Sequence, residues 1–135
     1  DVGTGAGFPG LPLAIANPAR QFTLIDSSGK KARFVAHAVR TLGLANVTAV
    51  HSRAEDLRPQ VPFETVTARA LAPLPELLRQ LAPLCGPQTR VLAMKGRWPE
   101  GELGKLPAPW RLAGSRRIEV PGLNAERCVL VLSMG

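Results

Sequence analysis

Short apolar segments with strand character alternate with segments of helical periodicity along most of this 135-residue chain. Strands are predicted at residues 22–26, 47–51, 63–68 and 90–95, and helices at residues 10–17, 28–42 and 73–84. Elements that alternate in this way build βαβ units around a mostly parallel sheet. Two more strands, around 112–120 and 127–133, flank a turn with Pro121 and Gly122, so an antiparallel pair is expected at the end of the chain. The sequence therefore predicts one α/β domain over residues 1–135, with ligands at the carboxyl ends of its strands.

Basic residues outnumber acidic residues in this chain, and most of the basic residues are arginines. Lysine and arginine number 17 against 10 aspartates and glutamates, which gives a formal net charge of +7. Guanidinium groups make bidentate contacts with phosphate and with the edge of guanine, so a polyanionic partner is expected. No apolar run approaches the roughly 20 residues of a membrane span, so no membrane partner is expected. Cys85, Cys128 and the two histidines lack the spacing of a zinc site, so we expect no metal, free thiols and a cytoplasmic location.

The chain opens on a glycine-rich loop, Asp1-Val-Gly-Thr-Gly-Ala-Gly-Phe-Pro-Gly10. Glycines allow sharp turns and let a ligand lie against bare backbone amides. Two interpretations compete. The segment from Gly5 to Gly10 fits the dinucleotide fingerprint G-x-G-x-x-G, whereas an acid before Gly3, Gly5 and Gly7 resembles the first motif of S-adenosylmethionine (SAM) methyltransferases.

Asp26 ends the next predicted strand. A carboxylate there can accept hydrogen bonds from both ribose hydroxyls of an adenosine, which NAD and SAM share. Asp26 therefore does not separate the two interpretations. It could also be an acid favoured by the dipole at the start of the following helix.

Further polar residues follow the later strands. After the strand at 47–51, the backbone of Ala54 and the side chain of Glu55 could meet an adenine, although Ser52 and Glu55 also have the spacing of a capping box. Arg69 and Lys95 are expected at the carboxyl ends of the next two strands. The alternative for Arg69 is a surface arginine paired with an acid, and the alternative for Lys95 is an ordinary solvated lysine. Arg127 begins the last strand beside Glu126, and here a salt bridge is the alternative.

The predicted helix at 28–42 has two faces. Its apolar positions recur at helical spacing and are Ala32, Val35, Val39 and Leu42. Its cationic positions are roughly opposite and are Lys30, Arg33, His37 and Arg40. Ser28 is a plausible N-cap and Gly43 lies just past the end, so the helix is expected to present cations to solvent or to phosphate.

Six segments in this order resemble the bacterial small-subunit rRNA guanine-N7 methyltransferase G family, also called glucose-inhibited division protein B. They are DVGTGAGFPGLPLAI, TLIDSSGKKARFV, SRAEDL, ARALAPL, AMKG and AERCVLVL. The resemblance implies a Rossmann-like methyltransferase sheet, SAM as methyl donor, and a guanine in the 530 loop of 16S rRNA as acceptor. It also implies that the family's first strand and N-terminal helices are missing from this chain.

The resemblance also implies roles for particular residues. Those expected to bind SAM are Asp1, Gly3, Gly5, Phe8, Asp26, Ala54, Glu55 and Arg69. Those expected to face 16S rRNA or the small ribosomal subunit are Lys30, Arg33, Arg53, Lys95 and Arg127. Phe8 and Trp98 could stack on a base.

N7 of guanine carries a lone pair and no proton, so methylation there needs positioning but no general base. We expect Arg69 and Lys95 to orient the guanine through O6 or a phosphate, in a monomeric enzyme. Two alternatives are an NAD-dependent oxidoreductase, although the chain has no tyrosine for a Tyr–Lys pair, and a non-catalytic ribosome-associated RNA-binding module.

Overall fold

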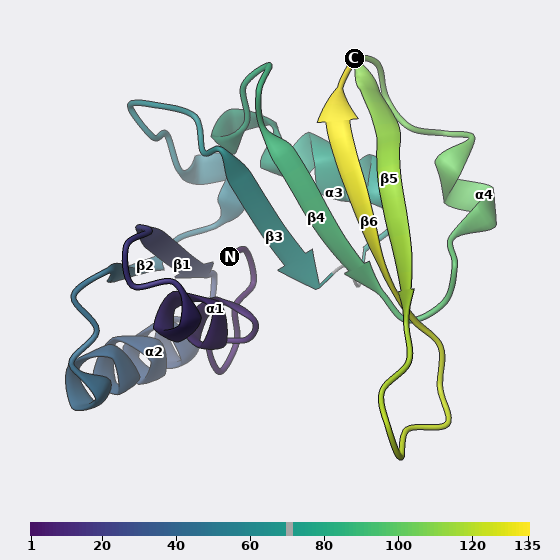
Figure 1. The fold of residues 1–135 in the computed structure, drawn as a ribbon. Coiled ribbons are helices and arrows are strands. Elements are labelled where there is room, and N and C mark those ends of the chain that lie inside the picture. Colours follow the sequence, from purple (N-terminus) through teal and green to yellow (C-terminus); the bar gives the residue numbers. More distant parts are fainter. Residues whose placement is uncertain (70–71) are drawn as a thin grey trace. The chain divides into compact units, whose positions relative to one another are not determined.

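A computed structural model describes residues 1–69 and 72–135 (Figure 1). The chain divides into two compact units, Asp1–Leu57 and Arg58–Gly135. Each unit is described by itself below. The prediction of one domain over residues 1–135 stays a prediction.

The first unit is built around a pair of parallel strands. Its elements are α1 (Gly10–Ala16), β1 (Phe22–Asp26), α2 (Gly29–Leu42), β2 (Val47–His51) and a 3₁₀ turn, η1 (Ala54–Asp56). The β1–β2 register runs from Phe22 opposite Val47 to Asp26 opposite His51. Val2 forms a parallel bridge with Ile25, so the opening residues pair with β1 as well. Leu11, Leu24 and Val35 bring α1, β1 and α2 together in one core.

Helix α2 begins and ends as its sequence predicts. The Ser28 side chain accepts a hydrogen bond from Lys31 N, and Gly43 closes the helix in the left-handed conformation. The predicted cationic face is exposed along its whole length. The predicted apolar face is wrong at Leu42, which is 54% exposed, because Leu44 packs against the core after the Gly43 turn instead.

The second unit holds a four-stranded sheet. Its elements are β3 (Thr65–Arg69), α3 (Leu74–Leu81), η2 (Ala82–Leu84), β4 (Arg90–Lys95), α4 (Glu100–Leu103), β5 (Trp110–Ile118) and β6 (Arg127–Met134). The strand order is β3-β4-β6-β5. Strands β3 and β4 are parallel, and β6 is antiparallel to both β4 and β5. The predicted α/β class, with parallel pairs and an antiparallel C-terminal pair, is confirmed.

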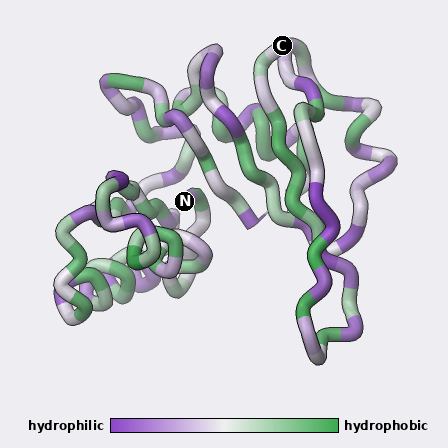
Figure 2. The backbone as a smooth tube through the Cα atoms, in the orientation of Figure 1, coloured by the Kyte–Doolittle hydropathy of each residue, from purple (hydrophilic) through white to green (hydrophobic). Residues whose placement is uncertain are grey.

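One face of this sheet is covered by α3, whose leucines at 74, 77, 78 and 81 are buried (Figure 1). Figure 2 shows the apolar character of β6 in green and the hydrophilic end of β5 in purple. The β5–β6 connection extends past the carboxyl ends of β3 and β4, because Lys95 pairs with Cys128 and Ile118 pairs with Arg127. The last residues of β3 and β4, Arg69 and Lys95, therefore lie at the same edge of the sheet as the β5–β6 connection.

Among the residues that the structure describes, no helix is long and apolar enough to cross a membrane. Within residues 1–69 and 72–135, no cluster of histidine, cysteine, aspartate and glutamate could hold a metal ion.

Candidate functional site

The opening loop of the first unit is a turn that only glycine adopts readily. Gly3, Gly5 and Gly7 have φ angles of +63°, +60° and +97°, a region that disfavours residues with a Cβ. Thr4 anchors the turn, since its N–H donates to Ile25 O at 3.0 Å and its carbonyl accepts from Gly7 N and Phe8 N. The glycine spacing noted in the sequence therefore reflects backbone geometry.

Two carboxylates hold this turn in place. Asp1 Oδ2 accepts from Thr4 Oγ1 at 2.6 Å and from Gly10 N at 3.0 Å. Asp26 Oδ2 accepts from Gly5 N, and its Oδ1 accepts from Ser28 N, both at 2.9 Å. Asp26 is only 7% exposed. The Asp1 contacts close the loop on itself, and the bond from Gly5 N to Asp26 attaches the loop to the end of β1.

The backbone nitrogen of Asp1 donates a hydrogen bond to Thr23 O at 2.8 Å, which pairs the start of the loop with β1.

The loop after β2 lies beside Asp26. Ser52 N donates to Asp26 O at 3.1 Å, which brings η1 next to the end of β1. The predicted capping box is wrong, because η1 starts one residue later with Arg53 as N-cap, and the Ser52 hydroxyl donates to Arg53 O instead. Ala54 is buried, and Arg53 forms a loose ion pair of 3.8 Å with Glu55.

The first unit thus gathers most of the residues predicted to bind a cofactor. Asp1, Gly3, Gly5 and Asp26 belong to one hydrogen-bonded turn, and Ser52 N links Ala54 and Glu55 to it. Phe8 stands in the same loop with its ring 52% exposed. Lys30 and Arg33 are exposed on α2.

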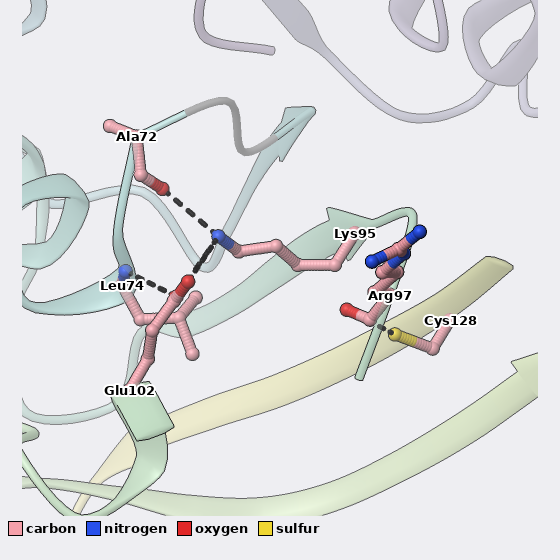
Figure 3. Close-up of polar contacts among 6 residues, drawn as sticks. All are labelled: Ala72, Leu74, Lys95, Arg97, Glu102 and Cys128. Carbon is pink, nitrogen blue, oxygen red and sulfur yellow. Dashed lines mark hydrogen bonds and ion pairs between the residues drawn. The ribbon is translucent and has the colours of Figure 1, made fainter. Parts of the chain in front are cut away.

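In the second unit, Lys95 differs from its prediction. Its side chain is only 10% exposed and its Nζ pairs with Glu102 Oε2 at 2.9 Å. The same ammonium donates to Ala72 O at 3.1 Å, and Glu102 Oε2 accepts from Leu74 N at 2.8 Å (Figure 3). Lys95 therefore links β4, α4 and the start of α3. Glu102 was not predicted from the sequence, because an acidic residue in a short helical turn gives no specific indication of such a contact.

The other predicted cations of this unit are exposed. Arg69 ends β3, opposite Met94 in the register. Arg127 begins β6, and its Nη1 donates to the backbone carbonyl of Glu126 at 2.7 Å rather than to that residue's carboxylate. Trp98 is half-buried, and its Nε1 donates to Glu100 Oε2 at 3.0 Å.

Both cysteines belong to the second unit and are free thiols. Burial raises the pKa of Cys85 to about 11, so the thiol stays protonated near neutral pH. Cys128 is buried and donates from Sγ to Arg97 O at 3.8 Å (Figure 3). Neither arrangement marks a nucleophile.

The fold has known counterparts. A solved structure of a SAM-dependent methyltransferase from Aquifex aeolicus matches 99% of this chain and 80% of its own, with a TM-score of 0.71 and 21% identity. The chain therefore has the same class of α/β fold as this methyltransferase.

The sequence comparisons are more specific. Residues 1–131 match the family model for rRNA small subunit methyltransferase G. Relatives of that name from Methylococcus capsulatus and Marinobacter nauticus are 52% and 44% identical over 94% and 98% of this chain. The chain belongs to the rRNA small subunit methyltransferase G family, as the sequence motifs predict. It spans about 62% of the length of these curated relatives.

Proposed function

We propose that the protein transfers the methyl group of SAM to N7 of a guanine in the 530 loop of 16S rRNA. The observation that carries the proposal is the glycine turn at residues 3–7, which is held at the end of β1 by the bond from Gly5 N to Asp26. Family membership supports the choice of SAM over NAD.

The residues of this turn fit the adenosine part of such a cofactor. A carboxylate has about four lone-pair sites, and Asp26 uses two of them for Gly5 N and Ser28 N. The remaining sites can accept the two ribose hydroxyls. A Cβ placed on Gly3 would meet no atom within 4 Å, so there is open space against the bare backbone. Ala54 and Glu55 follow Ser52, whose N–H is bonded to Asp26 O, and under this proposal they would meet the adenine.

The chemistry needs few groups from the protein. When bound, SAM supplies a methyl group on a sulfonium, and guanine N7 supplies a lone pair without a proton to remove. The residues of the chain then act by binding and orientation, which can account for a large part of a rate enhancement. Asp26 would hold the ribose, and Arg69, which is exposed at the end of β3, would orient O6 or a phosphate of the acceptor, because a cation on N7 itself would block the nucleophile.

The cationic surfaces support an RNA acceptor. Lys30 and Arg33 on α2, Arg53 after β2 and Arg127 on β6 are all exposed. When such side chains contact phosphates, they release counterions that were condensed on the RNA. This release favours binding, and it makes the affinity fall steeply as the salt concentration rises. We place the activity in the cytoplasm, in a monomer that acts on 16S rRNA or the small ribosomal subunit. The predicted contact of Lys95 with the acceptor competes with its bonds to Ala72 and Glu102.

The test begins with calorimetric titration of the purified protein with SAM and, in parallel, with NAD. We expect binding of SAM alone. Methyl transfer is then measured on 16S rRNA, free and in the small subunit, from cells that lack the enzyme, and the product is mapped as N7-methylguanosine. Binding of NAD instead would favour the oxidoreductase, and RNA binding without either ligand would favour the non-catalytic module.

A further inference from the structure

An open hollow of about 1150 Å³ lies in the second unit, beyond the ends of β4 and β5. One wall is the segment that follows β4, with Arg97 and Trp98, and the other is the β5–β6 connection. The hollow therefore lies at the carboxyl edge of β3 and β4. Apart from Trp98 and Arg127, the residues that line the hollow were not predicted to have a functional role.

The walls of the hollow are rich in exposed guanidinium groups. Arg97, Arg117 and Arg127 all line it and all are exposed. Glu119 and Glu126 line it too, yet neither carboxylate forms an ion pair with these arginines in the part of the chain that the structure describes. The guanidinium groups are therefore available to an anion, and Arg127 is oriented by its bond to Glu126 O.

An aromatic ring adds a surface for stacking. The Arg117 guanidinium carbon lies 6.0 Å from the centroid of the Trp98 ring, within the range of a cation–π contact. The hydrogen bond from Trp98 Nε1 to Glu100 fixes the ring's orientation. Indole rings and guanidinium planes are both surfaces on which bases of single-stranded RNA stack, while phosphates bind the edges of arginine side chains.

The rest of the lining is apolar and exposed. Ile118, Val120 and Leu123 on the β5–β6 connection are 39%, 43% and 44% exposed. Apolar side chains of this kind can pack against riboses and base faces. The combination of three guanidinium groups, one oriented indole and apolar contacts is complementary to a nucleotide chain, which alternates charged phosphates with flat bases.

We propose that this hollow binds a single-stranded segment of the RNA acceptor, through its phosphates and at least one base. The proposal rests on the proposed function, because it names a second contact region for the same RNA acceptor. Its residues are binding residues and take no part in the transfer step.

The test compares three single variants of the full protein, Arg117→Ala, Arg127→Ala and Arg116→Ala. Arg116 is the matched control, because it is exposed on the same strand and carries the same charge but does not line the hollow. Binding of a fluorescent RNA with the 530-loop sequence is measured by anisotropy at several salt concentrations. The slope of log affinity against log salt concentration is negative. For each phosphate contact to a single strand that is lost, its magnitude should decrease by about 0.7. We expect this loss for Arg117→Ala and Arg127→Ala, and a smaller change for Arg116→Ala.

A second arm tests stacking. Trp98→Ala should weaken RNA binding by about fivefold or more, with little change in the salt slope, as expected for a lost base contact. Trp98→Phe should restore part of the affinity. Thermal unfolding of each variant shows whether the fold is retained, and Arg117→Lys provides a milder second variant that keeps the charge.

The outcomes separate this proposal from the proposed function. The hollow is not an RNA site if Arg117→Ala and Arg127→Ala behave like Arg116→Ala, or if they weaken binding to the small subunit but not to free RNA, which would indicate a protein partner. Calorimetric SAM binding should be unchanged in all of these variants. A wild-type protein that binds no SAM overturns the proposed function, whatever the RNA data show.

Discussion

The two units of this chain use charged side chains in different ways. In Asp1–Leu57, the carboxylates of Asp1 and Asp26 each accept two hydrogen bonds from groups within the same unit, and three of these four bonds come from the opening loop. In Arg58–Gly135, the arginines around the hollow are exposed and are not ion-paired within the described residues. The first arrangement is formed before a ligand arrives, whereas the second loses side-chain entropy only on binding. A small cofactor suits the first, and a long flexible polyanion suits the second.

The comparison predicts that the first unit tolerates little added volume at its loop. A Cβ on Gly10 would lie 2.6 Å from Leu24 Cγ, and Leu24 is fully buried. Overpacking of this kind costs about 1–3 kcal/mol or more, so Gly10→Ala should lower the free energy of unfolding by about 3 kcal/mol and abolish SAM binding. Urea unfolding and calorimetry measure both.

Gly101→Ala is the matched control for Gly10→Ala. It lies in helix α4 of the second unit, and its added Cβ would meet no atom within 4 Å. Alanine is the better helix former, so this variant should be neutral or slightly stabilising. Equal stability of the two variants would contradict the close packing of α1 on β1.

Asp26→Asn tests whether the preformed loop matters for the cofactor. The amide keeps the shape but loses the charge, and its NH₂ group faces a backbone N–H. Hydrogen bonds to charged groups contribute about 1.5–3 kcal/mol, so SAM affinity should fall by at least about tenfold. Asp56→Asn, an exposed acid of the same unit, is the control in the same calorimetric titration. Unchanged affinity of Asp26→Asn would remove Asp26 from the cofactor site.

Local signals in the sequence predicted much of this first arrangement. Gly43 and Ser28 mark the ends of α2, and the spaced glycines predict the turn, because both depend on backbone preferences of neighbouring residues. No local pattern identifies the role of Asn46. In the structure it is buried, and its side-chain amide donates to carbonyls of α1 and of the α1–β1 connection more than 25 residues away.

Long-range pairing explains the other differences. Strand β3 begins at Thr65 rather than at residue 63, because Phe63 N donates to Leu84 O, outside the pairing with β4. Lys95 was placed correctly at the end of β4, but no local pattern could show that Glu102 and Ala72 surround its ammonium. The hollow depends on segments some 20 residues apart, so only its individual arginines were visible in the sequence.

Lys95 is an exception in the second unit, because its ammonium is bonded to Glu102 and Ala72 O instead of being exposed. Lys95→Met tests what this ion pair contributes. Removing the ammonium of this partly buried ion pair leaves the Glu102 carboxylate without its opposite charge. Discounted for the 29% exposure of Glu102, the loss of stability should be about 1–3 kcal/mol in urea unfolding. Lys105→Met, an exposed lysine of the same unit, should be neutral.

Glu102→Gln then separates the two roles of Lys95. If Lys95 acts by anchoring the start of α3, Glu102→Gln should lower methyl transfer as Lys95→Met does. If Lys95 contacts the RNA directly, Glu102→Gln should leave transfer close to wild type. A double-mutant cycle on the pair measures their coupling.

The smallest stability effect is expected for Arg53→Ala, the counterpart of Lys95→Met in the first unit. The Arg53–Glu55 pair is 3.8 Å long, with side chains 69% and 45% exposed. Pairs this exposed are screened by solvent, so the free energy of unfolding should change by less than about 0.5 kcal/mol. If Arg53 contacts RNA, its loss should instead appear as a lower salt slope in RNA binding. A large loss of stability would contradict the comparison, because the exposed cations would then have a structural role in this unit as well.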